Sequence, residues 1–248
     1  MTEDDAYHIR EIENLFVSQM RDTGASGYVI GLSGGIDSAL AAALCCRAVG
    51  PDKVSGLFMP SMVTPPQDRS DVDTLCTCLG MSWNEIPIAP IITVYQQIPG
   101  FLETPYLLGN LMARIRMTLL YFQANRDNLL VCGTSNRTEY LLSYCTKYGD
   151  NAADIQPIVH LLKDEVQELA KIVGIPEQIR MRIPTAGLYT GQTDEKELGL
   201  TYPEIDAAIR ALEANRFVAA TDTEQAVLLK IQNGAHKRKP SLSLMKKE

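Results

Sequence analysis

The sequence predicts an α/β fold, with a Rossmann-like parallel sheet flanked by helices on both faces. The first observation is that short apolar runs alternate with longer amphipathic stretches, the pattern of a parallel sheet covered on both sides. The second is a glycine- and serine-rich loop between an expected strand and an expected helix. The third is an ordinary globular composition, with 46% hydrophobic and 21% charged residues in 248. A single domain over residues 1–248 is therefore expected.

Apolar periodicity and chain breaks place the elements of the first half. The stretch 5–22 repeats apolar residues every three or four positions, as an amphipathic helix does, and GASG then breaks it. Short apolar runs predict buried strands, and an Ala-rich helix ends at Gly50-Pro51. The expected elements are a helix over 5–22, a strand over 28–32, a helix over 36–49, a strand over 54–59, a proline-rich loop over 60–68, a helix over 71–79 and a strand over 82–88.

The second half continues the alternation and adds two irregular stretches. The long helix expected over 105–125 has leucines that suit a subunit interface and a buried core equally. The other expected elements are a strand over 128–132 and helices over 138–144, 163–173, 202–215 and 223–233. The stretch 146–157 is polar and turn-rich, and 184–201 has little periodicity and three glycines. Such a length without structure is typical of a lid.

Charge and cysteine content exclude several classes of protein. With 23 basic and 30 acidic residues the net charge is −7, so a general nucleic-acid-binding surface is not expected. The most apolar run, 39–46, is too short to cross a membrane, and the acidic N-terminus is unlike a signal peptide. A cytoplasmic protein without membrane contact is expected. Cys76 and Cys78 have one residue between them, whereas a zinc half-site usually has two. The six cysteines are therefore expected to be buried, reduced thiols.

The clearest candidate site is the loop GLSGGIDSAL, residues 31–40, between the first strand and the next helix. Its glycines allow the backbone to approach an anion, while free N–H groups at the helix start and the hydroxyls of Ser33 and Ser38 can donate to it. The loop matches neither GxxxxGK[ST] nor GxGxxG. A carboxylate beside a phosphate needs a cation between them, so Asp37 is a candidate Mg²⁺ ligand. A plain glycine turn with Asp37 at the helix start is the alternative.

The loop resembles the SGGxDS signature of the PP-loop ATP pyrophosphatases, which cleave ATP between its α and β phosphates. Five further blocks occur in order: GNLMARIRM (109–117), GTSNRTE (133–139), TKYGD with AAD (146–154), LLKDEVQELAKIVGIP (161–176) and PTAGLYTGQTDEKELGLTYPEID (184–206). From about residue 8 to residue 240, the chain therefore resembles the ammonia-dependent NAD synthetases. The resemblance implies a C–N ligase and no glutaminase domain, so that ammonia comes from solution or from a partner.

The resemblance implies an ATP site that uses a magnesium ion. Asp37 and Glu139 match the two magnesium carboxylates, and Thr134, Lys163 and Thr185 match ATP contacts, the latter two acting on the phosphates. The loop residues implied to surround the phosphates are Gly31, Leu32, Ser33, Gly34, Gly35, Ile36, Asp37 and Ser38. Without the resemblance, Glu139 could be a solvated acidic residue on a helix face, and Lys163 a surface residue at the start of a helix.

The resemblance also implies a second substrate, deamido-NAD, which carries a nicotinate carboxylate. The residues that match its contacts are Arg114, Lys147, Asp154, His236 and Lys237. Asp150 matches an acid near the reacting end, with a role in steering or deprotonating ammonia. Taken singly, Arg114 could be an exposed helix residue and His236 a solvated one. One departure from the family is Asn151-Ala152 in place of a glycine pair, which could stiffen the loop or alter its closure.

The implied reaction has two steps. The nicotinate carboxylate attacks the α-phosphate of ATP and releases pyrophosphate; ammonia then attacks the acyl carbon and releases AMP, giving NAD⁺. Family members are homodimers with the dinucleotide near the interface. Two alternatives are another PP-loop enzyme that amidates or thiolates a different acceptor, and a non-catalytic module that binds adenine nucleotides. The negative net charge argues against a thiolation enzyme acting on RNA.

Overall fold

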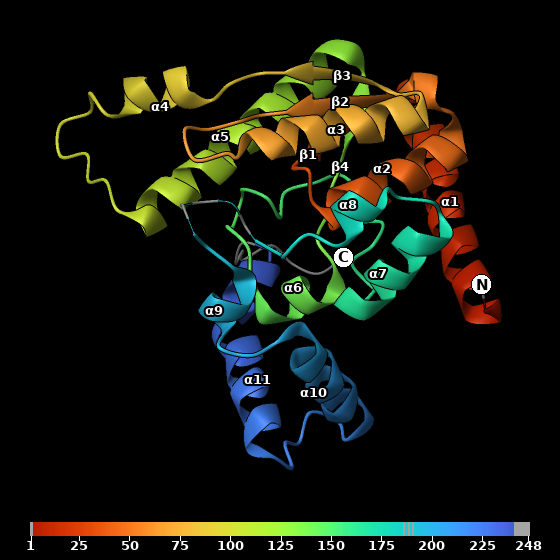
Figure 1. Cartoon of the computed structure of the whole chain (residues 1–248), viewed down its shortest axis with the longest axis vertical. Coiled ribbons are helices and arrows are strands. Elements are labelled where there is room, and N and C mark those ends of the chain that lie inside the picture. The colour runs from red at the N-terminus through yellow and green to blue at the C-terminus, as the bar shows by residue number, and fades with distance from the viewer. Residues whose placement is uncertain (1, 186, 188, 190, 241–248) are drawn as a thin grey trace, which may run out of the picture.

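Four parallel strands form the central sheet of the computed structural model, which describes residues 2–185, 187, 189 and 191–240 (Figure 1). The strands are β1 (Gly27–Leu32), β2 (Val54–Phe58), β3 (Ser82–Glu85) and β4 (Leu129–Cys132), in the spatial order β3-β2-β1-β4. Tyr28 is in register with Val54 of β2 on one side and with Leu130 of β4 on the other. The chain leaves β1 towards β2 and later returns to β4 on the opposite side. A crevice is therefore expected at the carboxyl ends of β1 and β4.

Helices cover both faces of the sheet, which confirms the predicted fold class. One apolar core joins the sheet to five helices: α1 (Glu3–Thr23), α2 (Ile36–Val49), α3 (Pro66–Leu79), α7 (Lys163–Ile172) and α8 (Glu177–Arg180). A second core joins the sheet to α4 (Ala89–Tyr95) and α5 (Pro105–Asp127). Strand β1, at the centre of the sheet, is apolar and almost entirely buried, and its side chains contribute to both cores.

A third apolar cluster lies beyond the sheet and joins α6, α10 and α11, the last two of which project downward in Figure 1. The elements of this part are α6 (Arg137–Leu142), α9 (Asp194–Leu198), α10 (Tyr202–Ala214), α11 (Asp222–Asn233) and α12 (Ala235–Arg238). The Ile205 and Leu212 side chains of α10 are fully buried here. The cluster fixes α6, and with it the residues that follow β4, against the rest of the chain.

The structure corrects some predicted boundaries. Helix α3 begins at Pro66, inside the stretch 60–68 that was expected to be a loop, because proline suits the first turn of a helix. Strand β3 ends at Glu85 rather than at residue 88, although the N–H groups of Ile86 and Ile88 still donate to the carbonyls of Phe58 and Pro60. The short helices η1 (Pro51–Lys53), α4, α8, α9 and α12 were not predicted. Helices this short depend on packing rather than on sequence periodicity.

The stretch expected to be an irregular lid, 184–201, contains α9, and its residues 186, 188 and 190 lie outside the described part of the chain. All six cysteines are unpaired, but Cys78 is exposed and Cys145 is half-buried, so the expectation of buried thiols was wrong for these two. Among the described residues, none of the helices combines the length and the apolar character needed to cross a membrane.

Candidate active site

A cavity of about 1050 Å³ opens at the carboxyl ends of β1 and β4, where the strand order predicts a crevice. Its volume is at the upper end of the range for small-molecule sites and is sufficient for a nucleotide. The loops after β1, β2 and β4 line it, together with the start of α7 and the segment 182–192 apart from its undescribed residues. Parallel strands bring these distant segments together because all their carboxyl ends lie at one edge of the sheet.

The glycine-rich loop forms one wall of the cavity. Helix α2 begins at Ile36, and Gly35 at its N-cap has no side chain to satisfy the first N–H groups, which leaves them suited to an anion. Ser38 Oγ donates to the carbonyl of Gly35 at 3.0 Å and lies 3.2 Å from Ser33 Oγ. Ser33 Oγ in turn accepts from the Gly35 N–H at 3.2 Å. These contacts hold the hydroxyl and amide groups of the loop in one arrangement at the wall of the cavity.

Lys163 holds the two candidate magnesium carboxylates together beside this loop. Its Nζ lies 2.6 Å from Asp37 Oδ2 and 3.9 Å from Glu139 Oε1. Lys163 is only 2% exposed, and its ammonium lies 5.1 Å from the centre of the Tyr202 ring. Neither Lys163 nor Glu139 is thus a solvated surface residue.

Burial and the charge of Asp37 act in the same direction on the pKa of Glu139, whereas burial and charge oppose each other at Lys163. Burial, reinforced by the charge of Asp37, raises the pKa of Glu139 to about 8. Burial alone would lower the pKa of Lys163, but Asp37 and Glu139 outweigh it and keep the pKa above its ordinary value. One cation thus faces two close carboxylates, and the excess negative charge would be relieved by a second cation.

Local hydrogen bonds explain how the chain positions these carboxylates. Asn136, at the start of α6, accepts from the Glu139 N–H at 2.9 Å, and Glu139 Oε2 accepts from the Asn136 N–H at 3.3 Å, which forms a capping box. The side-chain amide of Asn136 also donates to Asp37 Oδ1 at 2.8 Å. Asn136 therefore connects the start of α6 to the start of α2. The motif GTSNRTE contains Asn136, but only the fold shows that it contacts Asp37.

A buried network positions the start of α7 in the same way. Thr138 Oγ donates to Asp206 Oδ1 at 2.6 Å and accepts from the Lys163 N–H at 3.1 Å. The other oxygen of Asp206 accepts from the Asp164 N–H at 3.1 Å. Asp206 is only 1% exposed, so its carboxylate depends on these donors. Sequence reasoning missed Thr138 and Asp206, since they lie far apart in the chain.

Two arginines that sequence reasoning also missed line the cavity, Arg116 and Arg182. Arg116 Nε donates to the carbonyl of Met59 at 3.1 Å. Burial lowers the pKa of Arg116, and the charges of Asp150 and Asp68 oppose that change. The motif GNLMARIRM contains Arg116 beside Arg114, but only Arg114 was singled out.

The expected site residues divide into two groups. Those that line the cavity are Gly31, Leu32, Ser33, Gly35, Ile36, Asp37, Ser38, Thr134, Glu139, Asp150, Lys163, Thr185 and Lys237. Gly34, in the middle of the loop, is buried and is not part of the lining. Arg114, Lys147, Asp154 and His236 are outside this lining. The ATP residues expected from the sequence are thus brought together, whereas most of the expected dinucleotide residues lie beyond the cavity.

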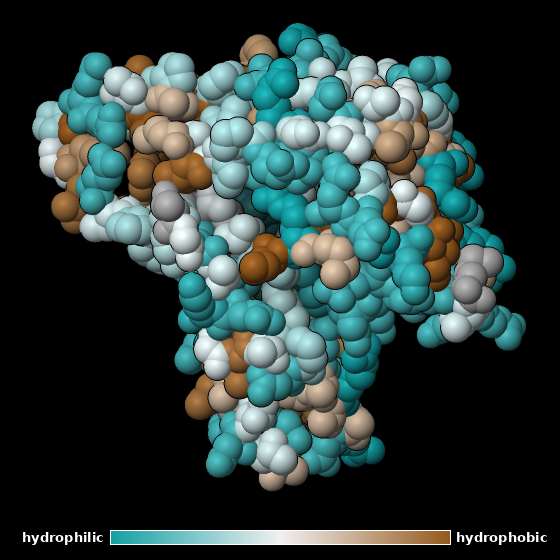
Figure 2. Space-filling view, in the orientation of Figure 1, coloured by the Kyte–Doolittle hydropathy of each residue, from teal (hydrophilic) through white to brown (hydrophobic). Residues whose placement is uncertain are grey.

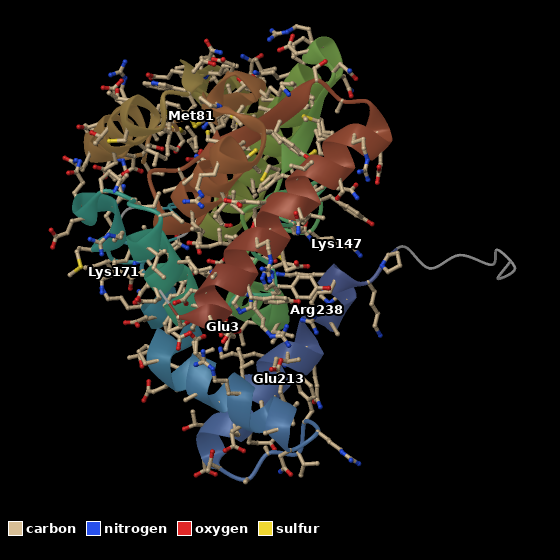
Figure 3. The ribbon with its side chains drawn as sticks, turned by 90° about the vertical axis from the view of Figure 1, so that its right-hand side faces the viewer. Glu3, Met81, Lys147, Lys171, Glu213 and Arg238 are labelled. Carbon is tan, nitrogen blue, oxygen red and sulfur yellow. The ribbon has the colours of Figure 1, made fainter. Side chains whose placement is uncertain are left out.

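The residues outside the cavity are connected to one another by hydrogen bonds. Arg114 donates from Nε and Nη2 to the carbonyl of Lys147 at 3.3 and 3.2 Å, and Lys147 Nζ donates to the carbonyl of His236 at 3.0 Å. Figure 3 shows Lys147 on the same side of the molecule as Arg238, near the end of the described chain. We call Arg114, Lys147 and His236 the outer basic patch. Asp154 instead accepts from the Val131 N–H at 2.7 Å, next to the end of β4.

Asp150 and Lys237 connect this patch to the cavity. Asp150 accepts from the Thr146 N–H at 2.8 Å, and partial desolvation by the surrounding protein raises the pKa of its carboxyl. Lys237 Nζ donates to the carbonyls of Ser143 and Cys145 at 3.1 and 2.7 Å. Asn151, at a position where the resemblance implied a glycine, donates to the Lys237 carbonyl at 3.4 Å and so connects the 146–157 loop to α12.

The residues present fit a magnesium ion. Among the described residues no cluster of three or more His, Cys, Asp and Glu could hold a metal ion alone. Mg²⁺, however, is usually held by one or two carboxylates together with substrate phosphates and water. Asp37 and Glu139 supply two carboxylates beside the glycine-rich loop, which matches that donor set.

Comparison with known proteins identifies the family. The family model described as NAD synthase matches residues 8–241. The chain belongs to the NAD synthase family. It is 56% identical over 235 residues to the NH(3)-dependent NAD(+) synthetase of Methanoregula boonei, with 95% of each chain covered.

Two solved structures of this family's fold are also similar to the chain. A Campylobacter jejuni NH3-dependent NAD synthetase, solved with a nitrate ion, has a TM-score of 0.82 and 32% identity, with 98% of this chain and all of that chain covered. A protein solved as the NMN synthetase of Francisella tularensis has a TM-score of 0.87 and 35% identity, with 96% and 98% covered. The sheet order and the cavity thus belong to an NAD synthase fold.

Proposed function

We propose that the chain is an ammonia-dependent NAD⁺ synthetase, which uses ATP to convert the nicotinate carboxylate of deamido-NAD into the amide of NAD⁺. One observation carries the assignment: Lys163, Asp37 and Glu139 meet beside an open helix N-terminus within one nucleotide-sized cavity. This arrangement suits a reaction in which negative charge moves onto a departing phosphate group. The enzyme is a C–N ligase of NAD biosynthesis.

In the first half-reaction, the chain binds ATP and stabilises pyrophosphate as it leaves. The nicotinate oxygen bonds to the α-phosphorus while the bond from that phosphorus to the β-phosphate bridge breaks, giving an acyl adenylate. The amides at the start of α2 and the Lys163 ammonium face the phosphates, and Thr134 and Thr185 add hydroxyl donors. A magnesium ion held by Asp37 and Glu139 would neutralise the charge of pyrophosphate.

In the second half-reaction, ammonia bonds to the acyl carbon and AMP leaves with the former carboxylate oxygen. The nitrogen must also lose a proton to give the amide. Asp150 lines the cavity and has a raised pKa, so its carboxylate is suited to orient ammonia and take that proton. The described residues of the segment 182–192 line the cavity, where they would help to keep water from the adenylate.

The proposed acceptor site extends from the cavity to the outer basic patch. Lys237 lies inside the cavity, and Arg114, Lys147 and His236 continue from it along the surface. A dinucleotide is long and carries a negative pyrophosphate, which fits a basic strip that leads out of the ATP cavity. Asp154, beside the end of β4, completes this proposed contact surface.

The proposal is tested by supplying two acceptors. Purified enzyme with ATP, Mg²⁺ and ammonium is expected to form NAD⁺ and AMP in equal amounts from deamido-NAD. We expect kcat/KM for deamido-NAD to exceed that for nicotinate mononucleotide at least tenfold, because only the dinucleotide reaches the outer basic patch. The mononucleotide is a specific alternative, since one similar structure is that of an NMN synthetase. The opposite preference would assign this chain to the mononucleotide reaction.

We further propose that the enzyme is a cytoplasmic homodimer that pairs through α4 and the start of α5. Exposed apolar side chains gather there, at the left of Figure 2. They include Val94, Ile98, Leu102, Tyr106 and Leu107, and Leu102 is 63% exposed. An apolar patch of this kind is typical of a protein interface.

The dimer proposal predicts the effect of one substitution. Leu102→Asp places a charge in the centre of the apolar patch, and sedimentation velocity is expected to show a monomer in place of the wild-type dimer. Leu229→Asp, at an exposed leucine of α11, is the matched control and is expected to remain a dimer. A Leu102→Asp protein that sediments as the wild-type dimer would place the interface elsewhere.

A further inference from the structure

Arg182 lies between the phosphate loop and α3, at the start of the segment that lines the cavity. Its Nη1 donates to the Gly34 carbonyl and to Asp71 Oδ2, both at 3.1 Å, and its Nη2 donates to Asp68 Oδ1 at 2.6 Å. Asp71 is only 1% exposed. The guanidinium is therefore fixed by three acceptors from two different parts of the chain.

The surroundings of Gly34 leave little room for a side chain, and its backbone conformation favours glycine. A Cβ at this position would lie 2.9 Å from Arg182 Nη1 and 3.1 Å from the backbone of Asp68. Gly34 also has a φ of +76°, which favours glycine. The loop, Arg182 and α3 therefore pack against each other at one edge of the cavity, which Asp68 and Arg182 also line.

The hydrogen bond to Gly34 controls the direction of the next amide. The Gly34 carbonyl and the Gly35 N–H belong to one planar peptide and point in opposite directions. Because Arg182 holds the carbonyl on one side, the Gly35 N–H faces the other side, where Ser33 Oγ accepts it at 3.2 Å. Gly35 lines the cavity and Gly34 does not. Without Arg182, the peptide between two glycines could rotate with little steric hindrance.

We infer that Arg182 is a positioning residue for ATP: it orients the 34–35 peptide so that the Gly35 N–H holds the Ser33 hydroxyl at the wall of the cavity where the triphosphate is proposed to bind. This inference rests on the proposed ATP site and assigns no direct substrate contact to Arg182. Asp68 and Asp71 neutralise the guanidinium, so its effect is on geometry rather than on charge. The same contacts hold the beginning of the 182–192 segment against the phosphate loop.

The test separates ATP binding from acceptor binding. Arg182→Ala is expected to raise KM for ATP, and Kd for ATP by calorimetry, about 10- to 100-fold, since a rotated 34–35 peptide releases the Ser33 hydroxyl from its position and one phosphate contact is lost. KM for deamido-NAD is expected to stay within about twofold of wild type, because Arg182 lies on the phosphate side of the cavity. Arg182→Lys retains one donor nitrogen, so its KM and Kd for ATP are expected to lie between those of the wild type and those of Arg182→Ala. Arg180→Ala is the control, because Arg180 donates at 2.9 Å to the Ile175 carbonyl and is outside the cavity lining.

Each outcome decides the inference. A lower kcat with both KM values unchanged would show a purely structural role and overturn it, as would an unchanged Kd for ATP. If Arg182→Ala does not fold, the same measurements on Arg182→Lys apply. If the wild type binds ATP but makes no NAD⁺, the proposed acceptor fails, while a weaker Kd in the Arg182 variant still supports positioning.

Discussion

Lys163→Met is expected to reduce NAD⁺ formation at least about 1000-fold. The substitution removes the only Lys or Arg side chain recorded in an ion pair with Asp37 and Glu139 among the described residues. It therefore removes the ammonium that would face pyrophosphate as it leaves. Because adenylation comes first, pyrophosphate release and NAD⁺ formation should decrease together. Both products are measured in the same reaction with deamido-NAD, ATP and ammonium.

The variant is also expected to be less stable, by about 3–5 kcal/mol in urea denaturation, because two close carboxylates lose their cation. Lys163→Met combined with Glu139→Gln should recover part of this stability without recovering activity. Lys171→Met, an exposed lysine of the same helix, is the control and should retain activity and stability. Pyrophosphate release at the wild-type rate by Lys163→Met would show that Lys163 is not needed for adenylation.

Glu139→Gln is expected to make the ligand-free protein more stable at pH 8 and inactive at the same time. In the folded protein the pKa of Glu139 is raised to about 8, mainly by burial, compared with an ordinary value of 4.5. The folded state therefore binds more protons than the unfolded state between these values, and wild-type stability falls as the pH rises from about 5 to 8. At about 1.4 kcal/mol per pKa unit, the loss due to Glu139 is about 2–5 kcal/mol.

Glutamine keeps the capping box with Asn136, since Gln can replace Glu at that position, but it has no proton to lose. The free energy of unfolding, measured in urea at pH 5 and pH 8, should thus change less with pH in the variant. Glu168→Gln, on an exposed face of α7, should retain the wild-type slope and activity. An identical slope in Glu139→Gln and wild type would show that other carboxyls cause the pH dependence. Full activity in Glu139→Gln would remove it from the proposed magnesium site.

The sequence by itself determined the fold class and the position of the phosphate loop. Both depend on short-range patterns: β1 is a continuous apolar run, the glycines follow it at once, and α2 begins at Ile36 as expected. Asp37, Glu139 and Lys163 could be singled out because each lies in a motif of the family. Their motifs predicted that the three act together.

Only the tertiary structure decided which further residues support that site. Arg182 contacts Gly34, and Asp206 contacts Thr138, across gaps of 148 and 68 residues in the chain. Helical or strand periodicity carries no information about such pairs, because it reflects only which face of an element is buried. The pairs exist because parallel strands end at one edge and α10 packs against α6 and α7, which brings distant polar groups into places where each needs a hydrogen-bond partner.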